Sequence, residues 1–139
     1  MIDVEYKVYT NVRKAVLDNF STASVSGVYV DKPSKLPHVS IEETDSYTPV
    51  GYNSLSDPEF AAALTYTVNI FTNTKTAKED AKAIAAVVND AFAEMGFARS
   101  MKQEMPNIDR TIYRLILRFR GTAWKGFDGV DGHYNISAR

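Results

Sequence analysis

Two histidines, His38 and His133, are the side chains of this sequence best suited to general acid–base chemistry. A Ser–His–Asp site would have to use one of them as its base. His38 follows Pro37 in a predicted strand, and no second histidine or carboxylate stands near it at a metal-ligand spacing. His133 lies in a glycine-rich segment, which is a poor place to hold a catalytic geometry. We therefore predict that His38 is a polar strand residue rather than a base or a ligand.

Other patterns that carry chemistry are missing from the sequence. There is no cysteine, and none of the motifs G-x-G-x-x-G, G-x-x-x-x-G-K, G-x-S-x-G or H-E-x-x-H occurs. The adjacent acids Glu42 and Glu43 would point to opposite faces of a strand, and Asp128 and Asp131 are only a weak cation-binding pattern. We predict no catalytic residue, no cofactor and no metal, and hence a protein that is not an enzyme.

A row of positive charge is the one pattern with functional promise. Arg114, Arg118 and Arg120 alternate with apolar residues in the clearest predicted strand, residues 110–122. Fixed positive charge on a sheet could attract the phosphates of DNA, but Ile112 and Ile116 interrupt the row and no aromatic platform for bases is interleaved. The favoured alternative is pairing with acids such as Glu42, Glu43 or Glu104, within or between subunits.

The stretch from Phe60 to Gly121 predicts the scaffold that positions this row. Apolar and polar residues alternate from 64 to 70, as in a strand with one covered face. A helix follows from Thr76, with Thr76 and Glu79 as a capping box and Gly96 as its stop. Its apolar stripe consists of Ala77, Ala81, Ile84, Ala85, Val88, Phe92 and Met95.

The remaining elements are a helix over residues 3–20 and strands over residues 28–30, 38–44 and 97–104. Residues 45–59 have the composition of a loop, either a surface excursion or an arm anchored on a neighbouring subunit by Tyr47 and Tyr52. Residues 123–139 are rich in glycine. Their aromatic residues, Trp124, Phe127 and Tyr134, would lie on the parent domain or reach over a neighbour, and the second arrangement is slightly favoured.

Length and composition favour one α+β domain. The chain has 139 residues, 45% hydrophobic residues and a net charge of −1, which argues against a protein that coats nucleic acid. Its N-terminus lacks the apolar run of a signal peptide, and no stretch approaches the length of a membrane span. We expect a soluble, intracellularly made protein with a mostly antiparallel sheet of four to five strands against two helices, spanning residues 1–122 and followed by a tail.

The order of these elements resembles that of the tail-terminator or tail-completion proteins of long-tailed bacteriophages and prophages. The resemblance covers residues 4–124. It is carried by "LPHVSIEE", by the strand and alanine-rich helix of "LTYTVNIFTNTKTAKEDAKAIAAVVNDAFAEMGF", and by "RTIYRLILRFRGTAW", whose Arg118-Phe119-Arg120-Gly121 fits the R-[FY]-R-G of that family. Residues 45–59 and the glycine-rich tail have no match, so a head-closure or other neck protein is the alternative within the same class.

The resemblance implies a non-enzymatic virion protein, made in the bacterial cytoplasm, that forms a hexameric ring. Such a ring would cap the tail tube, end its polymerisation and provide the surface that joins the head. It implies as partners other copies of the chain, the tail tube protein, a head-completion protein and double-stranded DNA in transit, with no membrane. The rival hypotheses are a small nucleic-acid-binding module that uses the Arg114–Arg120 face, and a small enzyme with a carboxylate or histidine site.

Overall fold

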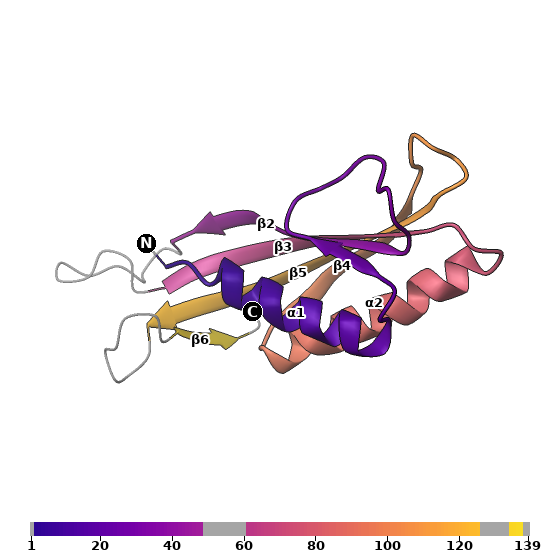
Figure 1. Ribbon diagram of the computed structural model, residues 1–139. Helices are drawn as coiled ribbons and strands as arrows, with labels where there is room; N and C mark the ends of the chain where they lie inside the picture. The colour runs from indigo at the N-terminus through magenta and orange to yellow at the C-terminus, as the bar shows by residue number, and fades with distance from the viewer. Residues whose placement is uncertain (1, 49–60, 126–133, 138–139) are drawn as a thin grey trace.

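The computed structural model describes residues 2–48, 61–125 and 134–137, which form two helices and a six-stranded sheet (Figure 1). In chain order the elements are α1 Glu5–Asn19, β1 Ser24–Ser26, β2 His38–Tyr47, β3 Ala61–Thr72, α2 Ala77–Glu94, β4 Ala98–Met105, β5 Tyr113–Lys125 and β6 Tyr134–Ser137. The predicted α+β class with a mostly antiparallel sheet and two helices is confirmed. The short strands β1 and β6 bring the sheet above the predicted four to five strands.

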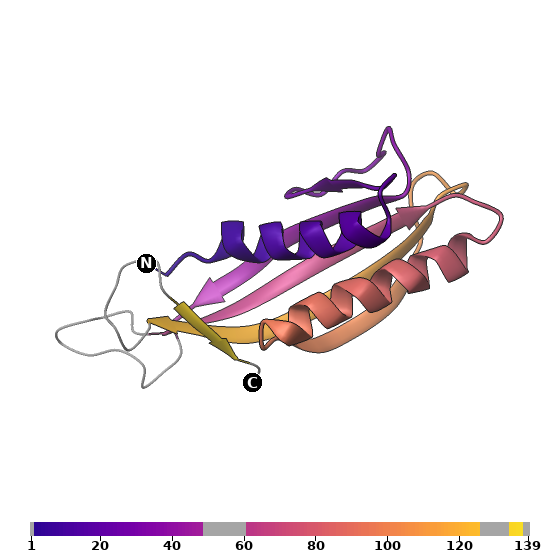
Figure 2. The same cartoon turned by 60° about the horizontal axis from the view of Figure 1, so that its bottom comes forward.

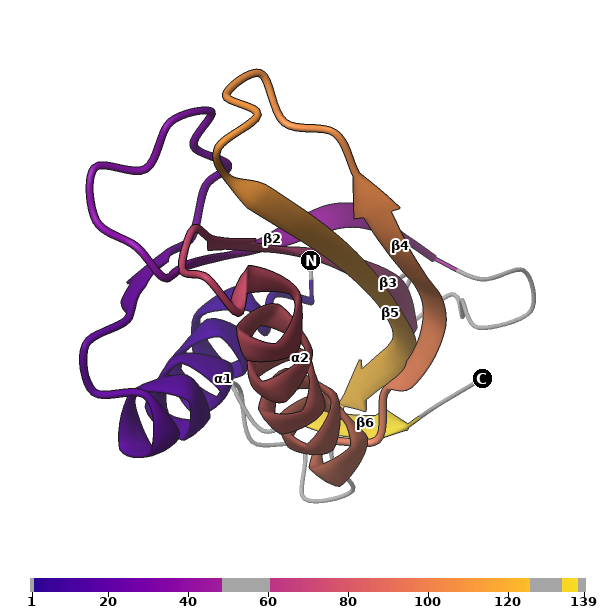
Figure 3. The same ribbon diagram turned by 90° about the vertical axis from the view of Figure 1, so that its right-hand side faces the viewer.

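The strands lie in the order β1-β2-β3-β5-β4, and β6 pairs with the end of β5. Every pairing is antiparallel except that of β1 with β2. Both helices pack on one face of the sheet (Figure 2), and the sheet curves around them (Figure 3). The opposite face carries no helix among the described residues, and we call it the open face.

The central strand β3 is buried along nearly its whole length. Leu64, Tyr66, Val68 and Ile70 face the helices, as the alternation predicts. The predicted polar side is buried as well, since Thr65 is 8% exposed and Asn69 is 3% exposed. Neighbouring strands flank β3 on both sides, so side chains of β2 and β5 cover its open face without any helix.

The second helix buries the predicted stripe but is capped differently from the prediction. Ala81, Ile84, Ala85, Val88 and Phe92 are buried against the sheet. The predicted capping box does not form. The Thr76 hydroxyl donates to Asp80 at 3.1 Å, and Thr74 donates to the other oxygen of the same carboxylate. Gly96 follows the helix at a φ of 91°, the left-handed conformation predicted for its stop.

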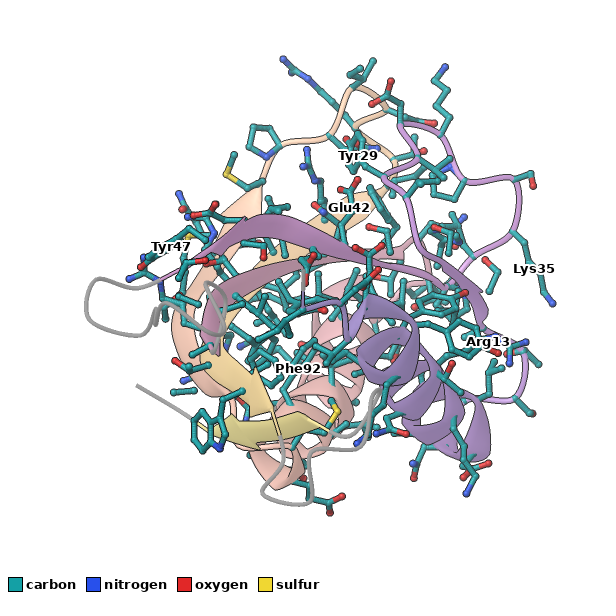
Figure 4. The ribbon with its side chains drawn as sticks, turned by 90° about the vertical axis from the view of Figure 1, so that its left-hand side faces the viewer. Arg13, Tyr29, Lys35, Glu42, Tyr47 and Phe92 are labelled. Atoms are coloured by element: carbon teal, nitrogen blue, oxygen red, sulfur yellow. The ribbon has the colours of Figure 1, made fainter. Side chains whose placement is uncertain are left out.

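Four aromatic rings join α2 to the sheet. Phe92 stacks on Phe119 of β5 with ring centroids 4.2 Å apart, and Phe97 meets both Phe92 and Tyr66 edge-on. Figure 4 shows Phe92 between the sheet and the helices. Gly121 makes room for this arrangement, because a Cβ there would lie 2.7 Å from the Phe97 ring. Packing against the Phe97 ring therefore explains why a glycine ends the R-[FY]-R-G pattern in this chain.

The N-terminal elements confirm one prediction and correct another. The predicted helix at 3–20 is α1, which buries Val8, Val12 and Val16. The strand predicted at 28–30 is wrong, since the short strand is Ser24–Ser26 instead. Tyr29 packs on the Phe71 ring at 6.1 Å, so its segment is held by side-chain contact rather than by a ladder.

Three element boundaries move relative to the prediction. β2 runs to Tyr47, into the predicted loop, whose residues 49–60 lie outside the described part. β5 begins at Tyr113 rather than at 110, because Asp109 Oδ1 accepts hydrogen bonds from the backbone N–H and hydroxyl of Thr111 and holds a turn there. β5 then continues past the boundary predicted at 122, and β6 pairs with its end, so the described parts of the predicted tail belong to the sheet.

Replacing Val88 by Asp should unfold the domain, because Val88 is 0% exposed and the new carboxylate would have no partner under the sheet. We expect a loss of several kcal/mol, a large part of the about 5–15 kcal/mol that holds a domain folded. Urea denaturation followed by circular dichroism measures it. Ala86→Asp, on the exposed side of the same helix, is the matched control and should fold. A folded Val88→Asp variant would contradict the stripe assignment.

Replacing Gly121 by Ala should lower the free energy of unfolding by about 1–3 kcal/mol, the usual cost of overpacking. The added methyl group would collide with the Phe97 ring. Gly27→Ala is the control, because a Cβ at that position meets the Tyr9 ring only at 3.8 Å. Equal unfolding midpoints for the two variants would show that the Phe97 ring can move aside without cost.

Candidate functional site

The predicted arginine row lies on the open face, but its three members have different environments. Arg114 is half-buried at one end of the face. Its Nε donates to Asn69 Oδ1 at 2.9 Å, and its guanidinium lies 4.9 Å from the centre of the Tyr29 ring. A guanidinium over an aromatic face is an attractive cation–π contact. Arg114 therefore fastens the segment that carries Tyr29 to the sheet.

Arg118 and Arg120 are exposed and line a depression of about 600 Å³ on the open face. The other lining residues are Thr44, Asp45, Thr65, Ser100 and Met101. Neither arginine forms an ion pair with another residue in the described ranges. The depression is therefore a basic surface with hydroxyl groups at its margin, and it suits the carboxylates or phosphates of another molecule.

Strand order separates these arginines from the described acids of β2. Across the sheet, Glu42 lies opposite Thr67, and Thr67 lies opposite Arg118. Asp45 and Arg120 are separated by Thr65 in the same way. Each acid thus lies two strand spacings from its nearest arginine in the row, roughly 9–10 Å between backbones. Pairing within the chain, the favoured alternative from the sequence, is not found among the described residues.

Glu43 points to the helix face, where it meets other acids. Its Oε1 accepts a hydrogen bond from the Tyr66 hydroxyl at 3.0 Å. Burial raises the pKa of the Glu43 carboxyl, the hydrogen bond from Tyr66 opposes the rise, and the carboxylates of Glu5 and Asp3 add to it. Burial, together with the charge of Glu43, likewise raises the pKa of Tyr66. Negative charge thus accumulates at the β2 side of the helix face.

His38 is held by two serines, an association that no sequence pattern predicts. Its Nδ1 lies 2.5 Å from the Ser24 hydroxyl and its Nε2 lies 3.0 Å from the Ser26 hydroxyl. Both hydroxyls also reach backbone carbonyls, those of Lys35 and Val28. Burial lowers the pKa of the imidazole, which is 7% exposed. With both ring nitrogens engaged, the contact fastens β1 to β2 and leaves no free nitrogen for a substrate.

Three of the five aromatic residues predicted as subunit anchors lie in the described part of the chain. Tyr47 is 52% exposed at the end of β2 and lies on the outer side of the sheet (Figure 4). Trp124 is half-buried in β5, opposite Ala61. Tyr134 belongs to β6 and pairs by its backbone with Lys125. Tyr52 and Phe127 lie outside the described residues.

A metal site and a membrane span are two further features to consider in the described residues. No group of three or more histidine and acidic side chains in the described ranges lies close enough to hold a metal ion. Asp128, Asp131 and His133 fall outside those ranges. Neither described helix has the length and apolar character that a bilayer crossing requires.

Glu43→Gln should stabilise the chain at neutral pH. An acid whose pKa is raised on folding stabilises the folded state below its unfolded pKa, and this contribution is lost as the pH rises through its folded pKa. The variant keeps an acceptor for Tyr66 and has no charge to lose. For the dilute, dissociated chain we expect the thermal midpoint of the variant to exceed that of the parent at pH 7, with the difference vanishing near pH 4.

Glu42→Gln, which changes the adjacent acid on the open face, is the control and should not reproduce this pattern. If the difference between Glu43→Gln and the parent chain were the same at both pH values, the raised pKa of Glu43 would be contradicted.

Comparison with known proteins places the fold but not a family. No protein-family model and no curated protein matches this sequence. Among solved structures, the fold is similar to that of a chain from the "Virion of native gene transfer agent (GTA) particle". The TM-score is 0.58 at 18% sequence identity, and the match covers 84% of this chain and 91% of the other. At this identity the likeness shows a shared fold, and the match spans nearly the whole of both chains.

Proposed function

We propose that this chain is a structural protein of a phage-like virion, which forms a ring that caps the tail tube, ends its polymerisation and provides the surface for head joining. The observation that carries the proposal is the match along 91% of a chain from a gene transfer agent virion. The sequence resemblance to tail-terminator proteins points to the same class independently of that match. The proposed partners are further copies of the chain, the tail tube protein and a head-completion protein, with double-stranded DNA in transit.

The distribution of charge supports a role in assembly. Arg118 and Arg120 are exposed on the open face and form no ion pair with a described residue, and acids gather around Glu43 on the other face. A ring is a closed head-to-tail assembly in which one surface of each subunit meets a different surface of the next. Two surfaces of opposite charge on one subunit suit such an arrangement better than a two-fold dimer, in which each surface would meet its own copy.

Light scattering and end-on electron micrographs of the purified chain test this function. We expect a ring whose mass is a fixed multiple of 15.5 kDa, with six copies as the expected number. A strict monomer at high concentration would count against it. A ring that lets tail tubes grow to unlimited length in a mixture with tube protein would indicate a head-closure or other neck protein instead.

The unpaired arginines also favour a second candidate, a nucleic-acid-binding module. Phosphate contacts of Arg118 and Arg120 would give binding that weakens as salt rises. Fluorescence anisotropy with a labelled duplex at low salt measures it. The Arg118→Ala/Arg120→Ala variant should lose this binding, whereas Lys78→Ala/Lys82→Ala on α2 should retain it. No binding by the parent chain would exclude this candidate.

A further inference from the structure

Two long edges of the sheet have no strand beside them among the described residues. On one side, β1 pairs with β2 only through residues 38–40, so the outer edge of β2 is free from Ile41 to Tyr47. On the other side, β4 is the last strand, free over Ala98–Met105. The two edges are of similar length, seven and eight residues. Each presents backbone N–H and C=O groups that a further strand could use.

The two edges carry opposite charge. The free part of β2 contains Glu42, Glu43 and Asp45 and no basic residue. The β4 edge contains Arg99 and Lys102, with Arg118 and Arg120 of β5 directly behind it. Glu104 is the exception. It lies near the far end of β4 and makes a hydrogen bond with Tyr113, whose pKa it raises together with burial to about 12.

The charges also match face by face and row by row. On the helix face, one row across the sheet runs Glu43, Tyr66, Phe119, Arg99. On the open face, two rows run Glu42, Thr67, Arg118, Met101 and Asp45, Thr65, Arg120, Ala98. Each of these rows begins with an acid on the β2 side and has an arginine toward the β4 side. The row of Glu104 begins at Val39, where β1 already occupies the β2 edge.

We propose that the free edge of β2 in one copy of this chain pairs with β4 of the next copy, so that the sheet continues from subunit to subunit. This inference rests on the proposed function and identifies the contact that would build the ring. Glu43 of one copy would approach Arg99 of the next on the helix face. On the open face, Glu42 and Asp45 would lie across β4 from Arg118 and Arg120 of the next copy, so the direct charge contact is that of Glu43 with Arg99.

Strand direction supports this pairing. β2 runs parallel to β5 and β4 runs antiparallel to it, so β2 and β4 point in opposite directions within one sheet. A second copy set beside the first with its helices on the same side keeps these directions. Its β2 would therefore run antiparallel to β4, which gives the slightly stronger of the two ladder types. The rows of opposite charge meet in this same arrangement.

Charges on edge strands also have a simpler purpose, which is to prevent aggregation. Charges of the same sign on both edges would oppose every edge-to-edge pairing and so would be enough to prevent aggregation. Opposite signs behave differently, because they oppose pairing of β2 with β2 and of β4 with β4 while favouring pairing of β2 with β4. The signs therefore select the head-to-tail contact over both self-pairings.

Thiol cross-linking tests the contact directly, since the chain has no cysteine of its own. Thr44 on β2 and Ser100 on β4 are exposed, and each lies at a register shift. Both lie next to the row that joins Glu43 to Arg99 across the sheet. With a short bismaleimide, Thr44→Cys mixed with Ser100→Cys should give a cross-linked pair, and neither variant alone should. The double variant should give a ladder that ends at the ring number.

Lys82→Cys on α2, mixed with Ser100→Cys, is the control and should remain uncross-linked. Rings without a cross-link between residues 44 and 100 would overturn the edge contact and leave the proposed function standing. Pairs formed by either variant alone would indicate self-pairing and overturn it as well. Monomers under all conditions would overturn both the contact and the ring.

Charge reversal gives a second, independent readout. Glu43→Lys or Arg99→Glu should each weaken association about tenfold or more in sedimentation velocity, because like charges then face each other. The double variant restores opposite signs and should recover most of the affinity. Lys82→Glu is the control. If both single variants associated as tightly as the parent chain, the edge contact would be contradicted.

Discussion

The position of β3 between β2 and β5 is the constraint on which the rest of this structure depends. It places two strand spacings between the acids of β2 and the arginines of β5, and no ion pair joins the two sets among the described residues. β3 also contributes the largest share of the core, since its side chains are buried on both faces. The same strand that stabilises the fold therefore separates the acids of β2 from the arginines of β5.

Burial of the helix face follows from packing rather than from charge. Val8, Val12 and Val16 of α1 and the stripe of α2 cover one face of the sheet, and the stacked rings of Phe92 and Phe119 fix α2 over β5. The open face is built differently. Its central polar side chains are shielded by their neighbours, as in the 2.9 Å hydrogen bond from Arg114 Nε to the buried Asn69 Oδ1. That face can remain in water without a second layer, which leaves the two edges as the unsatisfied part of the sheet.

Much of this fold could be predicted from local patterns, because each pattern depends only on residues within one helix or strand. The strand at 64–70, the stripe of α2 and the left-handed Gly96 are local features that were predicted, although the polar side of the strand is buried as well. The failures have physical causes that are not local. Thr76 bonds to Asp80 rather than to the helix backbone, and Ser24–Ser26 form a strand because His38, distant in sequence, binds both of their hydroxyls.

The candidate site was predicted only in part for the same reason. The sequence identifies Arg114, Arg118 and Arg120 as one row, but it does not reveal that Arg114 binds Asn69 and stacks on Tyr29 while the other two remain exposed. It also does not give the strand order, which places β3 between the arginines and the acids Glu42 and Glu43.

The environment of Glu43 connects the stability of a single chain with assembly. A partly buried carboxylate beside Glu5 and Asp3 is unfavourable when ionised, and among the described residues the Tyr66 hydroxyl offsets part of this cost. An isolated subunit gains nothing from such an arrangement. If Arg99 of a neighbouring copy lies next to Glu43, as we propose, the repulsion becomes attraction, and part of the cost borne by the monomer is recovered when copies associate. An acid that is unfavourable alone and favourable in contact makes association depend on the correct neighbour.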